Sequence, residues 1–473
     1  MILHQLATDY DGTIATGGAV SQATVAALRR VRASGRKILL ITGRILADVE
    51  QACPLAPELF DVIVGENGGV LRVTASGEER VLGSVPEPQF LDALAQRGVP
   101  FMTGRCSVHV DGADAEQALA AIRETGVDRT LTFNRGSLML LPTQVTKASG
   151  LQAALAVLGS SVHNTAGIGD GENDHAFLAI CELAVAVGDA VPALAKRADY
   201  VTRAAGPAGT REFVEEHLLS DAPALIRGVT RHHIRLGTRG RTEVLLPVHG
   251  ANLLAVTAPC SEGQSLVPLL IQRLAESGRC VVLIDRAGQC TSLHRMHGVV
   301  ALGRAGGRAL PSAAELDQIL RRAHASVVLD LSAVPPAEQV PYMSALVAAL
   351  RQSQVGTGLP HWLVIDAGAF RMPESVAQLF GGWEEGLCLA VASGDLVPPG
   401  SARTWTRVLA QGREAVDGAI RGLGWTPTTA ETALLQHRPS GDTYLVYANA
   451  ELIPFNLDVG RTDFGVVEPA ARL

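Results

Sequence analysis

Aromatic and charged residues are both scarce in this chain of 473 residues. Phe, Trp and Tyr make up 4% of it and charged residues 18%, whereas hydrophobic residues reach 47%. That balance excludes an intrinsically disordered chain and allows large buried cores. The length predicts about three domains of ~150 residues each.

Cysteine pairs are missing as well. The number of cysteines is odd, and no two of them are spaced as a CxxC pair. We therefore expect buried or free thiols in a reducing cytosol, and neither a disulfide framework nor a zinc site. The seven are Cys53, Cys106, Cys181, Cys260, Cys280, Cys290 and Cys388.

Long apolar runs and long basic runs are also absent. No uninterrupted apolar stretch approaches the ~20 residues of a membrane-spanning helix, and the start, MILHQLATDYDGT, lacks the basic region of a signal peptide. We expect a cytoplasmic protein with no membrane partner. A net charge of −7 argues against a nucleic-acid partner, and the arginines of 231–241 are interpreted as part of a solvated linker.

Short apolar runs alternate with amphipathic helical stretches over the first 220 residues. We expect strands at 2–8, 37–41, 62–64, 166–168 and 184–187, and helices at 21–34 and from Lys147 onward. Such alternation predicts an α/β domain, a parallel sheet with helices on both faces, over 1–83 and 144–218.

The pattern changes between 84 and 143. Helices are expected at 90–96 and 113–125, and strands at 107–110, 129–134 and 137–141, which predicts a small α+β insertion. A polar segment over 219–241 is expected to be a linker. A second α/β unit over 242–473 is predicted from strands at 253–257, 280–285, 326–331 and 362–366, with helices at 266–277 and 342–352.

Two carboxylates, Asp9 and Asp11, come directly after the first expected strand. Residues two apart in extended chain project to the same side, so one carboxylate can attack phosphorus while the other handles the proton of the leaving group. A divalent cation between them would relieve their repulsion. The alternative for the segment DYDGT is an Asp-Gly turn that closes a strand.

Thr42-Gly43 follows the strand 37–41, where a hydroxyl and a backbone N–H can hold a phosphoryl oxygen. Thr42 as a helix N-cap is the alternative. Lys147 stands in the first turn of a helix, against the helix dipole, and therefore favours a neighbouring anion. An exposed surface lysine is the alternative there.

A glycine-rich turn, Gly167-Ile168-Gly169-Asp170-Gly171-Glu172-Asn173-Asp174, is the most specific of these elements. Asp170 and Asp174 lie four residues apart beyond an expected strand. Few carboxylates combined with phosphate oxygens and water suit Mg²⁺.

Taken in order, the four elements resemble the motifs of the haloacid dehalogenase (HAD) superfamily over about residues 1–215. The DxDxT motif is matched by Asp9, Asp11 and Thr13, the second motif by Thr42, the third by Lys147, and GDxxND by Gly169, Asp170, Asn173 and Asp174. Glu66-Asn67-Gly68-Gly69 resembles the ENG segment of the Cof-type (C2-capped, IIB) subgroup. The resemblance implies a Rossmann-like core with a small α+β C2 cap over 84–143.

The resemblance also implies roles. Asp9 would be the nucleophile and Asp11 the acid and base, with its carbonyl on the metal. Thr42, Gly43, Lys147 and Asn173 would bind the substrate phosphate, and Lys147 would also orient Asp9. The expected cofactor is Mg²⁺, held by Asp9, Asp11, Asp170 and Asp174. Candidate contacts for substrate specificity are Arg44, Arg105, His109, Asn134 and Arg135, and the two cap arginines could equally be solvated.

Residues 242–400 resemble the P-loop ATPase fold of HerA-like proteins, in a degenerate form. In the loop after the strand 253–257, Ala258 replaces the first glycine of the Walker A motif and Gln264 its lysine. Asp366 matches the Walker B aspartate, but Ala367 stands where the catalytic glutamate belongs. No nucleotide-binding residues are therefore assigned, and we expect no ATP hydrolysis.

The sequence thus predicts a Mg²⁺-dependent phosphomonoester hydrolase for a small phosphorylated metabolite, a sugar phosphate or similar monoester. The alternative is a regulatory or interaction protein whose ATPase-like half binds a protein partner while the phosphatase half is auxiliary. A nucleic-acid motor is disfavoured by the acidic charge and by the missing Walker A lysine.

Overall fold

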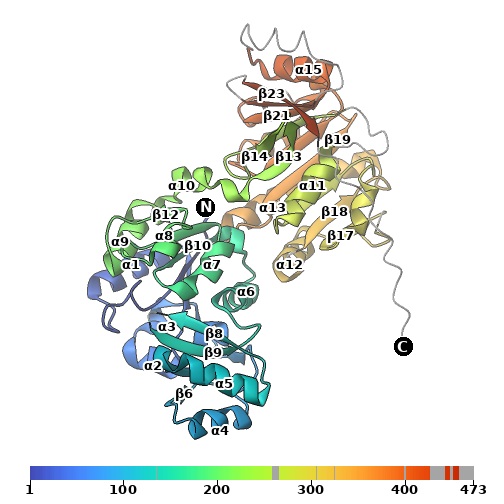
Figure 1. Ribbon diagram of the computed structural model, residues 1–473. Helices are drawn as coiled ribbons and strands as arrows, with labels where there is room; N and C mark the ends of the chain where they lie inside the picture. The colour runs from blue at the N-terminus through green and yellow to red at the C-terminus, as the bar shows by residue number, and fades with distance from the viewer. Residues whose placement is uncertain are drawn as a thin grey trace. The chain divides into compact units, whose positions relative to one another are not determined.

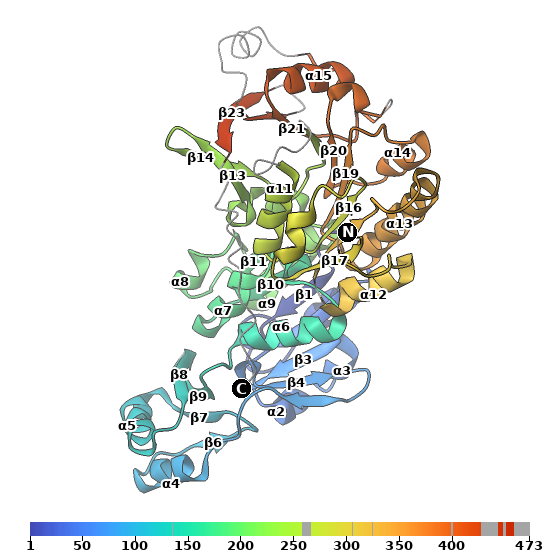
Figure 2. The same cartoon turned by 90° about the vertical axis from the view of Figure 1, so that its right-hand side faces the viewer.

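The chain divides into two compact units, Met1–Val229 and Thr230–Leu473 (Figures 1 and 2). The computed structural model describes residues 1–134, 136–257, 266–304, 306–323, 325–398, 401–426, 443–447 and 451–457. None of the described helices combines the length and the apolar character that a membrane crossing requires. The six described cysteines are buried, and none of them forms a disulfide.

An eight-stranded sheet in the order β12-β11-β10-β1-β2-β3-β4-β5 forms the centre of the first unit. The strands from β12 to β3 pair in parallel, and β4 and β5 close the edge in antiparallel pairing. Their bounds are β1 Gln5–Thr8, β2 Lys37–Ile41, β3 Val62–Gly65, β4 Val70–Val73, β5 Glu79–Val81, β10 Thr165–Gly169, β11 Leu183–Ala186 and β12 Tyr200–Val201.

Helices cover both faces of this sheet, because the central strands are apolar on both sides. One face packs on α1 (Gln22–Ala33), α2 (Leu46–Ala52), α3 (Ala56–Leu59), α9 (Gly206–Glu216) and α10 (Pro223–Gly228); the other packs on α6 (Lys147–Leu158), α7 (His175–Ile180) and α8 (Pro192–Ala195). The Ser21 hydroxyl accepts a hydrogen bond from the Thr24 N–H at 3.2 Å, so the expected start of the first helix is confirmed.

A smaller antiparallel sheet, in the order β6-β7-β9-β8, forms the cap of this unit. Its strands are β6 Met102–Thr103, β7 Val108–Asp111, β8 Arg129–Asn134 and β9 Ser137–Pro142. Helices α4 (Pro88–Gln96) and α5 (Ala115–Thr125) share one apolar cluster with Val108, Val110, Leu138 and Leu140. Because side chains alternate along a strand, the opposite face presents the cross-strand row Met102, His109 and Met139.

The second unit is a larger mixed sheet with eleven strands among the described residues, in the order β14-β13-β23-β22-β21-β15-β20-β19-β16-β18-β17. The strands from β21 to β17 run parallel, and β14, β13, β23 and β22 are added in antiparallel pairing. The bounds are β13 Ile234–Arg239, β14 Thr242–Leu246, β15 Leu253–Val256, β16 Val281–Asp285, β17 Val299–Gly303, β18 Ser326–Asp330, β19 Trp362–Gly368, β20 Leu387–Val391, β21 Arg407–Gln411, β22 Thr443–Tyr447 and β23 Leu452–Leu457.

Helices again lie on both faces of the second sheet. The helices α12 (Ala313–Ala323), α13 (Pro336–Thr357), α14 (Glu374–Phe380) and α15 (Arg413–Leu423) share one apolar cluster with its strands, and α11 (Leu266–Glu276) shares the other. The second half is therefore an α/β unit, as expected from its strand and helix pattern.

The segment 219–241, expected as a linker, contains regular structure instead. Helix α10 packs Ile226 into the core of the first unit, and β13 pairs with β14 and β23 of the second sheet. The alternation Ile234-Arg235-Leu236 buries both apolar residues while the arginine between them stays exposed. A strand with one polar face explains why this stretch looks hydrophilic in the sequence.

The residues that carry the P-loop resemblance are placed only in part. The loop with Ala258 and Gln264 lies outside the described residues. Asp366 lies near the end of β19, in register with Asp285 at the end of β16, and Ala367 is fully buried. The degenerate P-loop interpretation of this half stays a prediction.

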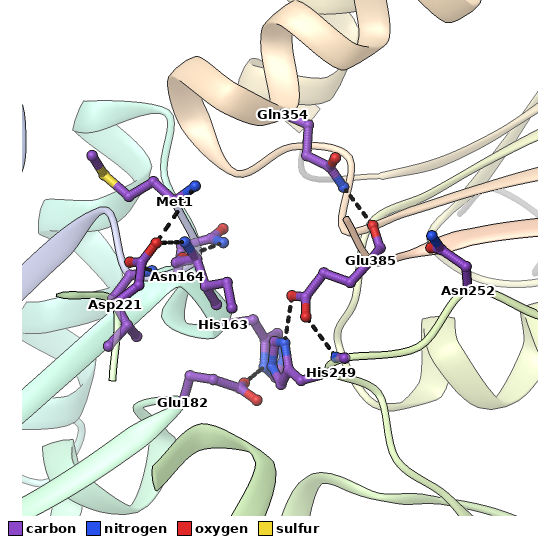
Figure 3. A network of polar contacts seen from close by, with 12 residues as sticks. Met1, His163, Asn164, Glu182, Asp221, His249, Asn252, Gln354 and Glu385 are labelled. Carbon is purple, nitrogen blue, oxygen red and sulfur yellow. Dashed lines mark hydrogen bonds and ion pairs between the residues drawn. The ribbon is translucent and has the colours of Figure 1, made fainter. Parts of the chain in front are cut away.

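Asp221, near the end of the first unit, forms hydrogen bonds with the residues that precede its first strand. Its carboxylate accepts hydrogen bonds from the N–H groups of Ile2 and Leu3 at 3.0 and 3.2 Å, and from the buried Arg36 guanidinium at 2.9 Å. Figure 3 shows Asp221 beside Met1. These contacts extend the unit beyond residue 218, where the sequence suggests that it ends.

We predict that a fragment of residues 1–229 folds and hydrolyses an aryl phosphate, and that residues 1–218 form a less stable protein. The shorter fragment loses the partner of Arg36 and the apolar contacts of α10, a loss of about 3 kcal/mol or more. Urea unfolding of both fragments measures the difference. The variant Asp221→Asn in the longer fragment isolates the ion pair, and equal stability of all three proteins would contradict the prediction.

Candidate active site

The four sequence motifs meet at one edge of the first sheet. Asp9 directly follows β1, Thr42 follows β2, Glu66 follows β3 and Asp170 follows β10, and these four strands are neighbours in the order β10-β1-β2-β3. Because they are parallel, their carboxyl ends lie together. Asp9, Thr42, Glu66 and Asp170 are all buried.

Lys147 bridges two of the carboxylates. Its Nζ donates to Asp9 Oδ1 and to Asp174 Oδ1, each at 2.5 Å, and its side chain is fully buried. Burial disfavours the ammonium, but Asp174 and Asp9 outweigh this effect and raise the pKa of Lys147. Burial raises the pKa of Asp9 well above its usual range, against the opposing effect of Lys147. The structure thus excludes the alternative of an exposed surface lysine.

Asp170 and Asp174 differ in how their oxygens are used. Asp174 Oδ2 accepts the N–H groups of Asp170 and Gly171, both at 2.8 Å, while Oδ1 accepts from Lys147. Asp170 Oδ1 accepts from the Thr13 hydroxyl at 3.0 Å. The bonds on both oxygens hold the Asp174 carboxylate in one orientation.

These carboxylates form a donor set that suits a divalent cation. One oxygen each from Asp9, Asp170 and Asp174 lies within 4.8 Å of the others. A Cβ at Gly12, which has φ +78°, would lie 2.4 Å from Asp170 Oδ2, so glycine at this position keeps the space beside that oxygen open. Buried carboxylate oxygens with room beside them fit Mg²⁺, which prefers few carboxylates plus phosphate and water.

Asp11 pairs with Arg44. The Arg44 guanidinium makes two hydrogen bonds to the Asp11 carboxylate, at 2.6 and 2.7 Å, and lies over the Tyr10 ring at 5.1 Å. The Asp11 side chain is 48% exposed, unlike that of Asp9. Arg44 is therefore placed to orient the second carboxylate of the motif, and it also lines the cavity beside Asp9.

The turn Glu66–Gly68 connects three parts of the site. Asn67, at φ +55°, accepts a hydrogen bond from Asn173 Nδ2 at 3.0 Å. A Cβ at Gly68 would lie 2.0 Å from the Thr146 carbonyl, so glycine there lets the start of α6, which carries Lys147, approach the sheet. The Glu66 carboxylate accepts from the N–H groups of Arg105, Cys106 and Ser107 in the cap. Burial raises the pKa of Glu66, but these bonds outweigh it and lower the pKa overall.

A cavity of about 250 Å³ lies between the ends of the core strands and the cap. A Cβ at Gly43 would lie 3.2 Å from Met139 Sδ, which shows how closely the cap approaches the Thr42-Gly43 turn. The residues that line the cavity are Asp9, Asp11, Thr42, Gly43, Arg44, Ile45, Asp48, Met102, His109, Asn134, Ser137 and Met139.

The expected specificity residues divide into three groups. Arg44, His109 and Asn134 line the cavity, whereas Arg105 does not and pairs with Glu79 on the surface. Arg135 lies outside the described residues. Sequence reasoning missed Asp48, Met102 and Met139. The period of two along the cap strands could have identified Met139, because it puts Met139 on the face opposite the apolar Leu138 and Leu140.

The fold and the site together fit an α/β enzyme that handles phosphoryl groups, and the sequence comparisons with known proteins agree. A model of haloacid dehalogenase-like hydrolases matches residues 6–103 and 101–210. A phosphoglycolate phosphatase of Methanothermobacter thermautotrophicus is 31% identical over 225 residues, which cover 46% of this chain and 99% of that protein. Another, from Methanoculleus marisnigri, is 27% identical over 228 residues, 46% and 97% of the two chains.

Among solved structures, a haloacid dehalogenase-like hydrolase from Bacteroides thetaiotaomicron covers 45% of this chain and 99% of its own, with 20% identity and a TM-score of 0.40. On the sequence matches, the chain belongs to the haloacid dehalogenase-like hydrolases through its first half, and this half is a phosphatase of that family.

Proposed function

We propose that this chain is a Mg²⁺-dependent phosphomonoester hydrolase that acts through an aspartyl-phosphate on Asp9. The observation that carries the proposal is Lys147, a buried cation 2.5 Å from both Asp9 and Asp174, with Asp170 in the same group of carboxylates. Phosphoryl transfer needs positioning and charge neutralisation above all, and this constellation supplies both. A relative that is 31% identical over this half is named a phosphoglycolate phosphatase, so a small monoester is the expected substrate.

The first half of the reaction uses Asp9 and Asp11. Asp9 Oδ2 attacks phosphorus, the ester P–O bond breaks, and Asp11, as the general acid, gives a proton to the leaving oxygen. Lys147 holds Asp9 Oδ1 and thereby points the other oxygen at the substrate. The Thr42 hydroxyl, the Gly43 N–H and Asn173 hold the phosphoryl oxygens.

The second half returns the enzyme to its starting state. Asp11, now a carboxylate, takes a proton from water, the water oxygen attacks phosphorus, and the P–O bond to Asp9 breaks to release phosphate. Arg44 keeps Asp11 in position through its two hydrogen bonds. Mg²⁺, when bound by Asp9, Asp170 and the Asp11 carbonyl, would neutralise phosphoryl charge. Asp174 would order this set of ligands through its bonds to Lys147 and to the Asp170 N–H.

Release of phosphate from p-nitrophenyl phosphate, with and without Mg²⁺, tests this function directly. Turnover that requires the metal supports it, and no turnover of this ester or of a panel of phosphorylated metabolites would refute it. Sugar phosphates and related polyol monoesters belong in the panel, because a cavity of about 250 Å³ admits small molecules of that size.

We predict that Asp170→Asn raises the Mg²⁺ concentration for half-maximal activity by about 100-fold or more. Replacing a residue that only orients a metal ligand already lowers metal affinity by up to about 100-fold, and replacing the ligand itself should lower it at least as much. A magnesium titration of aryl phosphate turnover measures this. Glu172→Gln, the neighbouring exposed carboxylate of the same turn, is the matched control and should leave the titration within about 3-fold of the parent. An unchanged midpoint in Asp170→Asn would exclude it as a ligand.

For the second half we propose an α/β scaffold without ATP hydrolysis. Ala367 is fully buried and offers a methyl group where the P-loop resemblance would require a general base. A regulatory or protein-binding role for this half remains the second candidate function of the chain. Absence of ATP turnover by the intact protein would agree with this proposal, and robust Mg²⁺-dependent turnover that survives Asp9→Asn would overturn it.

A further inference from the structure

His109 belongs to the cap and faces the active-site cavity. It occupies the centre of β7, between Met102 of β6 and Met139 of β9 in one cross-strand row, and it lines the cavity that contains Asp9. This row gives the cap side of the cavity two thioethers and one imidazole, and Asn134 and Ser137 line the same side. The imidazole is the polar group of the row.

A chain of hydrogen bonds fixes which ring nitrogen of His109 carries the proton. The Glu66 carboxylate is held ionised by three backbone N–H groups, so it can only accept. The single proton of the Ser107 hydroxyl is donated to Glu66 Oε2 at 2.9 Å. The Ser107 oxygen, 2.9 Å from His109 Nε2, must then accept the proton that Nε2 carries.

The other ring nitrogen, Nδ1, is consequently an acceptor. Burial lowers the pKa of His109, against the opposing effects of Glu66 and Asp48, so the ring is neutral at pH 7 and carries one proton. Nδ1 makes no hydrogen bond to any group in the described part of the chain. Its lone pair is available to a molecule in the cavity.

Asp48 gives the same wall a second acceptor. It lies in α2, lines the cavity, and among the described residues its carboxylate makes neither an ion pair nor a hydrogen bond. Arg44 is the single cation among the described residues that line the cavity, and it is engaged with Asp11 through two hydrogen bonds. Within the described residues, the cap side of the cavity thus offers the acceptors of His109 and Asp48 beside the neutral side chains of Asn134 and Ser137, and no uncommitted cation.

We propose that His109 and Asp48 are specificity residues that select phosphomonoesters whose leaving group carries hydrogen-bond donors, and that they discriminate against a carboxylate such as that of phosphoglycolate. The inference rests on the proposed phosphatase function and names its substrate class. A hydroxyl can donate to one of these acceptors and an ammonium group to both, whereas a carboxylate has no proton to donate and meets the negative charge of Asp48. The Glu66–Ser107 pair acts on specificity indirectly, by holding the His109 tautomer.

Three two-carbon monoesters that differ only at their far end test the proposal with the full-length protein and Mg²⁺. They are the monophosphates of glycolate, ethylene glycol and ethanolamine, which end in a carboxylate, a hydroxyl and an ammonium. We expect kcat/KM for ethylene glycol phosphate to exceed that for phosphoglycolate by at least about 10-fold. A substrate that has no donor leaves the acceptors of the site without a hydrogen bond, and sites of this kind reject such substrates strongly. The ethanolamine ester shows whether hydroxyl or ammonium is preferred.

Two variants assign the selectivity to the named residues. Asp48→Asn removes the negative charge and should lower the ratio of the two kcat/KM values by about 10-fold, while Asp92→Asn, an exposed carboxylate of α4, should leave the ratio unchanged. Ser107→Ala removes the acceptor for Nε2–H and frees the tautomer. The ¹⁵N shifts of ring-labelled His109, assigned with His109→Gln, should then lose the pattern of the Nε2–H form, and Ser76→Ala in an exposed turn should not change them.

The outcomes separate the two proposals. Hydrolysis of p-nitrophenyl phosphate together with a preference for phosphoglycolate over the glycol ester would overturn the specificity inference and leave the phosphatase function intact. An unchanged ratio in a folded Asp48→Asn protein would do the same. Failure to hydrolyse any of the monoesters would refute the phosphatase function, and the inference with it. Ser107 is buried, so Ser107→Ala is the variant that can most easily fail to fold. The Asp48 variant therefore tests the specificity inference independently.

Discussion

Asp9→Asn is expected to lower kcat by about 10⁵-fold, since loss of a nucleophile removes a whole covalent step. The amide occupies almost the same volume as the carboxylate, so the fold should be retained. Asp9 lies at the centre of the site, against Lys147 at 2.5 Å and in one group with Asp170 and Asp174. Initial rates with p-nitrophenyl phosphate at saturating Mg²⁺ measure the effect, and circular dichroism checks the fold.

The same substitution at an exposed aspartate of the cap provides the control. Asp111 accepts a hydrogen bond from the Ala113 N–H at 2.8 Å and lies outside the residues that line the cavity. Asp111→Asn should therefore retain the parent rate within about 3-fold. Undiminished turnover in a folded Asp9→Asn protein would show that another group is the nucleophile.

Lys147→Met is expected to affect stability as well as rate. The substitution keeps the length of the side chain but leaves Asp9 and Asp174 in a buried site without their cation. Breaking a buried ion pair by removing one partner costs about 3–5 kcal/mol in free energy of unfolding. Removing one donor to the phosphoryl group should lower kcat by about 10²–10³-fold.

Urea unfolding with and without Mg²⁺ separates the two roles of Lys147. Because the divalent cation would lie among the same carboxylates, added Mg²⁺ should recover part of the lost stability but not the lost rate. Lys37→Met is the matched control: its Nζ lies 3.1 Å from Asp61 but its side chain is 53% exposed, so the expected loss is below about 1 kcal/mol. Equal stability of the two variants would contradict the bridging role.

Local patterns in the sequence predicted the framework of the catalytic half. Apolar strands followed by Asp9, Thr42 and Asp170 indicated a parallel sheet, and the carboxyl ends of such strands meet whatever the remaining sequence is. The cap could be predicted for the same reason, since the continuous apolar run of β9 and the helical spacing in α4 are local signals. The capped start of α6 at Lys147 likewise depends on neighbouring residues alone.

Contacts between distant residues could not be predicted. Nothing near Asp11 indicates that Arg44, 33 positions away, will pair with it, or that Glu66 will accept hydrogen bonds from a loop about 40 positions away. The strand β13 was taken for a linker because its pairing with β23 joins residues more than 200 positions apart. The orientation of His109 depends on Ser107 and Glu66 together, so no property of the histidine itself could have indicated it.

The way Glu66 holds the cap has a consequence for how this enzyme can diversify. Three of the four hydrogen bonds that it accepts come from backbone N–H groups, at 105, 106 and 107, which every residue except proline supplies. The attachment of the cap is therefore almost independent of the cap's own side chains. Residues of the cavity wall can be exchanged to admit a new leaving group while the anchor, and with it the nearby turn that positions Lys147, stays the same.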